Sequence, residues 1–165
     1  ASETYSSVTA SIQLAAIKAY QRTDEIEEYL HHQRRILRLL GNYCYEQMDA
    51  VGVNLHAPEG GFYLFPEFSQ YKEQFQSLGI TTSGELAAAL LGNTGVAVIP
   101  GSALGMPESV FCARMAYVDF DGITALKASY NIGLDTPLDE SFMDEYAPQV
   151  KNGVNALTKW LNSLS

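Results

Sequence analysis

The sequence is poor in positive charge. Its 165 residues contain ten lysines and arginines against 19 aspartates and glutamates, which gives a formal net charge of −9. DNA and RNA are bound mainly through basic side chains that neutralise phosphates, and an acidic surface repels them. The composition therefore predicts a protein without a nucleic-acid partner.

Cysteine is equally scarce. Cys44 lies in a helical pattern and Cys112 in a strand pattern, and no Cys/Cys or Cys/His spacing typical of a metal site occurs. We expect two buried free thiols in a reducing cytoplasm, and no bound metal.

Long apolar runs are also missing. No stretch approaches the roughly 18 residues of a membrane-spanning helix. The opening segment "ASETYSSVTA" is polar and lacks the apolar centre of a signal peptide. We therefore expect a cytoplasmic protein with no membrane partner. The chain starts with Ala1 rather than Met, which suggests a piece of a longer protein.

What is present is the patterning of a folded chain, with 47% hydrophobic and 18% charged residues. Helical spacing predicts a helix over 7–21 and a long helix over 23–52, with Thr23 as its N-cap and acidic residues in its first turn. Further predictions are two short strands within 53–68, a capped helix over 82–93, strands over 95–100 and 110–118, and a final helix with an apolar stripe at Val150, Val154, Leu157, Leu161 and Leu164.

This order predicts the α+β class. We expect a small, mostly antiparallel sheet covered by helices on one face, together with a long N-terminal connecting helix. Residues 1–22 are assigned to an interdomain segment and connecting helix, and residues 23–165 to one domain.

Arg114 is the strongest candidate functional residue, because it lies inside an otherwise apolar strand. Alternation places Val110, Cys112, Arg114, Ala116 and Val118 on one face, and both faces are apolar, which predicts a strand inside the sheet. A buried guanidinium without an anion costs several kcal/mol. Its partner is therefore either a carboxylate from elsewhere in the fold or a bound ligand, since the planar fork suits a carboxylate.

Other polar or small residues give weaker signals. Gly60-Gly61 and Gly101-Ser102 follow or precede strands, where glycine marks either a turn or a close approach to the backbone. His31 and His32 are expected to be solvated on the long helix, and His56 has no identifiable partner. The acidic residues Asp139, Glu140, Asp144 and Glu145 are typical of a solvated helix start.

An ordered set of segments resembles a known family. "PEGGFYLFPEF", then "GVAVIPGSALG", then an arginine-bearing strand is similar to the C-terminal small domain of class I/II aminotransferases, which are fold-type I enzymes that use pyridoxal 5′-phosphate. The opening "SETYSSVTASIQLAAIKAY" is similar to the segment that leads into the helix joining the two domains. The resemblance covers roughly residues 1–118.

The resemblance implies roles for particular residues. Arg114 would hold the α-carboxylate of the amino-acid substrate, Gly61 and Tyr63 would lie near the substrate, and Gly101 and Ser102 would close over the same region. Tyr5 and Ser7 would approach the cofactor of a neighbouring subunit. The implied partners are amino-acid and 2-oxo-acid substrates, the large domain of the same enzyme and, in the full-length protein, a second subunit of a homodimer.

The sequence departs from the family in two places. None of its lysines lies in the setting of the family's cofactor-binding lysine, so the chain is expected to be an inactive fragment that binds no cofactor. Residues 119–142 form a longer connection to the last helix than the family usually has. Two other interpretations remain open: a non-catalytic acidic module that binds a carboxylate through Arg114, and a structural domain with Arg114 in an internal ion pair. A lyase or decarboxylase of the same fold is a further alternative.

Overall fold

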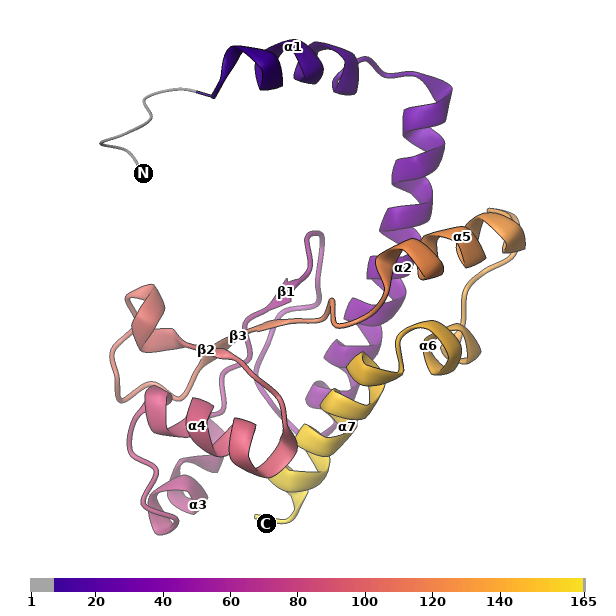
Figure 1. Cartoon of the computed structure of the whole chain (residues 1–165). Coiled ribbons are helices and arrows are strands. Elements are labelled where there is room, and N and C mark those ends of the chain that lie inside the picture. The colour runs from indigo at the N-terminus through magenta and orange to yellow at the C-terminus, as the bar shows by residue number, and fades with distance from the viewer. Residues whose placement is uncertain (1–7, 165) are drawn as a thin grey trace.

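The long helix α2 (Asp24–Ala50) is the element against which much of the chain packs (Figure 1). It belongs to a computed structural model that describes residues 8–164. The helix begins as predicted, because the Thr23 side chain accepts a hydrogen bond from the backbone N–H of Ile26 at 3.3 Å. It ends at Ala50, just before Gly52, which has the positive φ of 78° that glycine adopts without strain.

The remaining elements are mostly helices, with three short strands among them. The helices are α1 (Ala10–Ala19), α3 (Lys72–Ser77), α4 (Ser83–Thr94), α5 (Gly122–Ile132), α6 (Glu140–Tyr146) and α7 (Pro148–Asn162), with short 3-10 helices at Ser69–Tyr71 (η1) and Gly101–Leu104 (η2). The strands are β1 (Tyr63–Leu64), β2 (Ile99–Pro100) and β3 (Ala113–Ala116).

The three strands form one antiparallel sheet in the order β1-β3-β2. β3 therefore lies in the middle, as the apolar pattern around Arg114 predicted. Tyr63 pairs with Ala116 on one side of β3, and Ile99 pairs with Arg114 on the other. The α+β class with a small antiparallel sheet is confirmed.

Helices cover one face of this sheet. On that inner face Phe111, Ala113, Met115 and Tyr117 are all buried, and they join one core with the apolar stripe of α7. In Figure 1, α4 and α7 lie on one side of the sheet and α1 lies on the other. Ala116 and Val118 on the outer face are exposed, in agreement with the expectation of a sheet covered by helices on one face.

α1 stands apart from this core. None of its residues is buried, and its apolar side chains face solvent. The exposed residues in and beside this helix are Val8, Ile12, Leu14, Ile17 and Tyr20. A largely apolar helix without a covered face is typical of an element that packs against something else.

The segment 119–142, expected only as an insertion, contains α5 and the start of α6. α5 begins where the Asp121 side chain accepts hydrogen bonds from the backbone N–H groups of Ile123 and Thr124, and α6 begins at Asp139 in the same way. The Asp-x-x-Thr pattern at 121–124 is typical of a helix N-cap and could have predicted the start of α5. The predicted solvated helix start at Asp139–Glu145 is confirmed.

Several predicted boundaries were wrong. The helix expected to close at Gly92-Asn93 continues to Thr94, and Gly95 ends it in the left-handed conformation with a φ of 75°. The capping box of Thr82 and Glu85 is confirmed. The strands are much shorter than their apolar runs, and beyond their ends pairing continues only as isolated bridges, such as the one between Glu67 and Cys112.

His32 is buried, contrary to the prediction that it is solvated, whereas its neighbour His31 is exposed. Its Nδ1 lies 2.7 Å from the Ser129 hydroxyl oxygen, and its ring stacks on Tyr130 with centroids 3.9 Å apart. These contacts join α5 to α2. Burial, aided by the positive charge of Arg35, lowers the pKa of His32 below its usual range.

This burial predicts a pH dependence of stability. The neutral form of His32 is favoured only in the folded state, so the unfolded chain binds the extra proton once the pH falls below about 6.5. We expect the free energy of unfolding to fall by up to about 1.4 kcal/mol per pH unit below that pH. Urea unfolding of the chain between about pH 7.5 and pH 5.5 measures the slope.

His32→Gln should flatten this slope, and His31→Gln should retain it, because His31 is exposed and makes no comparable contact. The depressed carboxyl pKa values of Asp121 and Asp139 act in a lower window, since their contribution is lost only as the pH falls through the acidic range. An unchanged slope in His32→Gln would contradict the assignment to His32.

Candidate functional site

Arg114 lies on the open, outer face of the sheet, in the central strand β3. Its neighbours in the strand, Ala113 and Met115, are buried on the inner face, so the backbone that carries the guanidinium is anchored by the core. The residue itself is half-buried, which differs from the deeply buried guanidinium predicted from the strand pattern. Its neighbours on this face, Ile99, Ala116 and Val118, are exposed as well.

The guanidinium is packed but not paired. Its Cζ lies 4.4 Å from the centre of the Tyr63 ring, which places a cation over an aromatic face. Tyr63 shares the outer face because it pairs with Ala116, two residues further along β3. Within residues 8–164 no carboxylate oxygen lies within 4.0 Å of the Arg114 nitrogens. The internal ion pair considered from the sequence therefore has no partner in the described chain.

The outer face around Arg114 is apolar and exposed. Ile99 lies directly opposite Arg114 on β2, and its side chain is exposed like those of Phe65 and Val118. Ile99 was not predicted as a site residue, although the register of two antiparallel strands could have suggested it. A cation surrounded by exposed apolar side chains can bind a carboxylate whose other end is apolar or held elsewhere.

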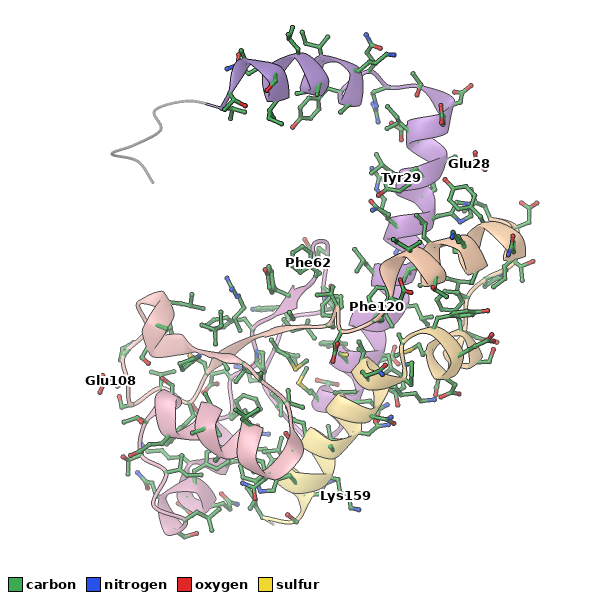
Figure 2. The ribbon with its side chains drawn as sticks, viewed as in Figure 1. Glu28, Tyr29, Phe62, Glu108, Phe120 and Lys159 are labelled. Carbon is green, nitrogen blue, oxygen red and sulfur yellow. The ribbon has the colours of Figure 1, made fainter. Side chains whose placement is uncertain are left out.

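Gly61 lies on the loop that enters β1, next to the exposed ring of Phe62 at the tip of that loop (Figure 2). Its φ is 69°, and a methyl group added to it would meet no atom within 4 Å. The Tyr117 hydroxyl donates a hydrogen bond to the Gly61 carbonyl at 3.2 Å, and burial raises the pKa of Tyr117, so that the donor stays protonated. Gly61 is thus a fixed but open position.

Gly101 and Ser102 lie on the opposite edge of β3 and have structural contacts of their own. The Gly101 N–H donates to the Cys112 carbonyl at 2.8 Å, and a methyl group on Gly101 would collide with the Cys112 sulfur. The Ser83 hydroxyl donates to the Ser102 hydroxyl at 3.0 Å, which ties the loop to the start of α4. The sequence left open whether Gly101 marks a turn or a close approach to the backbone. The structure shows a close approach, to the backbone and sulfur of Cys112.

The sheet therefore brings Arg114 and Tyr63 into contact, and places the loop of Gly61 and the turn of Gly101-Ser102 at its two edges. Tyr5 and Ser7, predicted to face a neighbouring subunit's cofactor, lie outside the described residues.

Burial raises the pKa of Cys44 to about 12, so this thiol is protonated at neutral pH. Both cysteines are free and buried, as predicted.

Known proteins resemble this chain in sequence and in fold. The family model of aminotransferase class I and II matches residues 1–121. An aspartate aminotransferase of Bacillus sp. (strain YM-2) is 37% identical over 119 residues, which cover 71% of this chain and 28% of that protein. An aspartate aminotransferase of Bacillus subtilis is 35% identical over 121 residues, with the same coverage.

A solved structure of a Pyrococcus protein shares the fold, with a TM-score of 0.59 and 20% identity over 93% of this chain and 31% of that one. The chain belongs to the class I and II aminotransferases. It spans about 28% of the length of the curated relatives it matches.

Aminotransferases of this family use pyridoxal phosphate, which is held covalently by a lysine. The lysines of this chain do not fit that role. Lys151 contacts Asp144 at 2.7 Å and Glu140 at 3.1 Å, and hydrogen bonds to both carboxylates raise its pKa to about 12, which disfavours the neutral amine that attacks an aldehyde. The other four are exposed on helices, and Figure 2 shows Lys159 at the far end of α7 from Phe62. These four are Lys18, Lys72, Lys127 and Lys159.

Among residues 8–164 no group of three or more His, Cys, Asp or Glu side chains could hold a metal ion. In the same part of the chain, no helix is both long and apolar enough to cross a bilayer.

The contact between Gly101 and Cys112 gives a stability prediction. Gly101→Ala should lower the free energy of unfolding by about 1–3 kcal/mol, because the new methyl group collides with a buried sulfur that cannot move freely. Gly60→Ala is the matched control and should change stability by less than about 0.5 kcal/mol, since nothing lies within 4 Å of its added methyl. Denaturant unfolding of both variants measures the difference. Equal effects would show that Gly101 is not packed as described.

Proposed function

We propose that this chain is the small, C-terminal domain of a pyridoxal-phosphate-dependent aminotransferase, and that Arg114 binds the α-carboxylate of the amino-acid and 2-oxo-acid substrates. One observation supports it most. The cation on the central strand has no carboxylate partner in the described chain and faces the uncovered side of the sheet, in a chain that belongs to this family. Residues 1–22 would form the interdomain segment and residues 23–165 the small domain.

The proposed role of Arg114 is binding and orientation. A guanidinium covered on one face by an aromatic ring keeps its in-plane N–H groups, which match the two oxygens of a carboxylate. Two hydrogen bonds in one plane would fix the direction of the bond from Cα to the carboxylate, and with it the alignment of the other bonds at Cα. Arg114 is not proposed to transfer a proton, because a guanidinium stays protonated.

The remaining site residues would shape the space around that carboxylate. Tyr63 supports the guanidinium, and Gly61 leaves room for a ligand close to the backbone at the tip of the β1 loop. Gly101 and Ser102 are proposed to border the site through the turn that Ser83 and Cys112 hold in place. The named activity of two relatives supports L-aspartate as the first amino donor to test.

The exposed apolar residues support a missing partner. α1 has no covered face, and the outer face of the sheet is apolar, so both need a surface against which to pack. We propose that the large domain of the same enzyme covers them, that it supplies the cofactor lysine, and that the full-length protein is a homodimer. The 165-residue chain alone would then be inactive.

The carboxylate contact is tested in the full-length enzyme by Arg114→Lys. Lysine keeps the charge but offers a single point of contact, so kcat/KM for L-aspartate should fall by about 10- to 100-fold, as expected for the loss of a bidentate hydrogen bond. Arg22→Lys is the matched control, because Arg22 is exposed and its one ion pair within residues 8–164 is with Glu27 at 2.9 Å. Equal kinetics in the two variants would remove Arg114 from the site.

The absence of a suitable lysine is tested with the 165-residue chain. After incubation with pyridoxal phosphate and borohydride, we expect no stoichiometric label on any one of its five lysines, and no stable yellow complex. Peptide mapping by mass spectrometry measures the label. A single lysine modified to completion would contradict the proposal that the cofactor is held by residues outside this chain.

A further inference from the structure

Tyr117 connects the loop that enters β1 to the buried side of the sheet. It directly follows β3, and its side chain is buried. Its backbone N–H donates to the Phe62 carbonyl at 3.3 Å, and its hydroxyl donates to the Gly61 carbonyl at 3.2 Å. Within residues 8–164, these two are the hydrogen bonds that loop residues 56–62 form. A single residue therefore holds two successive carbonyl groups of the loop.

The space for the Tyr117 hydroxyl is provided by α2. Gly41 of this helix is buried, and a methyl group added to it would lie 2.9 Å from the Tyr117 hydroxyl oxygen and 3.0 Å from the Pro58 side chain. Both distances are shorter than an ordinary van der Waals contact of about 3.5–4.0 Å. Glycine is unfavourable inside a helix, so its presence here is explained by the space that the phenol and the loop require. The Tyr117 hydroxyl therefore packs against α2 as well as the loop.

The same loop determines how Arg114 is supported. Its last residue, Phe62, packs on Tyr63 with ring centroids 4.3 Å apart, and Cζ of Arg114 lies 4.4 Å from the centre of the Tyr63 ring. β1 consists of Tyr63 and Leu64 only, so its own ladder to β3 is short. The direction of the Tyr63 ring thus depends on where the loop enters the strand. A shift of the loop would reach the guanidinium through that ring.

We propose that Tyr117 is a positioning residue for the carboxylate site on Arg114, and that Gly41 leaves the space which this role requires. The Tyr117 hydroxyl holds the Gly61 carbonyl, and the loop then holds the Tyr63 ring on one face of the guanidinium, so that the in-plane N–H groups stay available to a carboxylate. Tyr117 itself does not contact the substrate, because its side chain is buried in the core. This role rests on the function proposed for Arg114.

Tyr117→Phe in the full-length enzyme removes the hydroxyl and keeps the ring, so this variant should fold. The loop then spends less time in the arrangement that binds, and KM for L-aspartate should rise by about three- to tenfold, as expected for the loss of one neutral hydrogen bond. kcat should change by less than about twofold, because saturating substrate restores the binding arrangement. Steady-state kinetics measure both constants. A purely structural hydroxyl would instead lower the amount of active enzyme, and with it kcat, at an unchanged KM.

Tyr43→Phe is the matched control. Tyr43 is also buried, and its hydroxyl donates to Oδ1 of Asn155 on α7 at 3.1 Å, so its loss should leave KM unchanged. Gly41→Ala should raise KM as Tyr117→Phe does, because the new methyl group displaces the Tyr117 hydroxyl or Pro58. Gly41→Ala combined with Tyr117→Phe should raise KM little further, since both changes break the same hydrogen bond.

The loop itself is tested without substrate in the 165-residue chain. Phe62 is exposed at the tip of the loop, so chymotrypsin can cleave after it (Figure 2). Cleavage after Phe62, followed by mass spectrometry, should be at least about threefold faster in Tyr117→Phe than in the unaltered chain, because the loop opens more often. Tyr43→Phe should be cleaved there at the unaltered rate.

The outcomes separate the role of Tyr117 from that of Arg114. If Arg114→Lys lowers kcat/KM while Tyr117→Phe has the same KM as Tyr43→Phe, Arg114 remains the carboxylate-binding residue and the positioning role of Tyr117 is wrong, whatever the rate of cleavage. Cleavage after Phe62 at the unaltered rate in Tyr117→Phe would show that the hydroxyl does not hold the loop, and would also overturn the positioning role. If Arg114→Lys has no effect, the function proposed for Arg114 fails, and faster cleavage would then show only that Tyr117 holds the loop.

Discussion

The structure depends on a sheet of three short strands that is covered on one side only. Met115 in β3 and Tyr117 just after it belong to one core cluster with buried residues of α2, α4 and α7. Because side chains alternate along a strand, each buried inner residue fixes the direction of an outer one. The one-sided cover therefore does two things at once: it anchors Arg114 through its neighbours, and it leaves the guanidinium facing outward.

The two edge strands complete this arrangement in different ways. On the β1 side, Tyr63 packs its ring on Arg114, and the Tyr117 hydroxyl crosses to the loop at Gly61. On the β2 side, Gly101 approaches Cys112 so closely that no larger residue fits, and this contact fixes where the turn of Ser102 begins. Residues that are distant in the sequence thus converge on β3 because a narrow sheet brings both of its edges close to the centre.

α2 has a comparable role for the C-terminal third of the chain. His32 and Arg35 lie on adjacent turns, and both contact α5, through Ser129 and Gly133 respectively. One turn further on, the same face of α2 presents Arg38, and then Glu46, to the α5–α6 connection. α2 thus packs against the sheet on one side and supports α5 and α6 on the other. A longer C-terminal connection can therefore be accommodated without a change to the face of the sheet that carries Arg114.

The sequence by itself determined the features that depend on local interactions or on alternation. Thr23, the capping box of Thr82 and Glu85, the central position of β3 and the stripe on α7 were all readable, because capping and apolar periodicity act over a few residues. Only the tertiary structure decided which face of β3 is uncovered, that His32 is buried, and where the strands end. Burial is decided by whichever element packs there, and α5, which buries His32, lies nearly one hundred residues away in the chain. The outer face of the sheet is open around Arg114, where Ile99, Ala116 and Val118 are exposed, and this too depends on how distant elements pack.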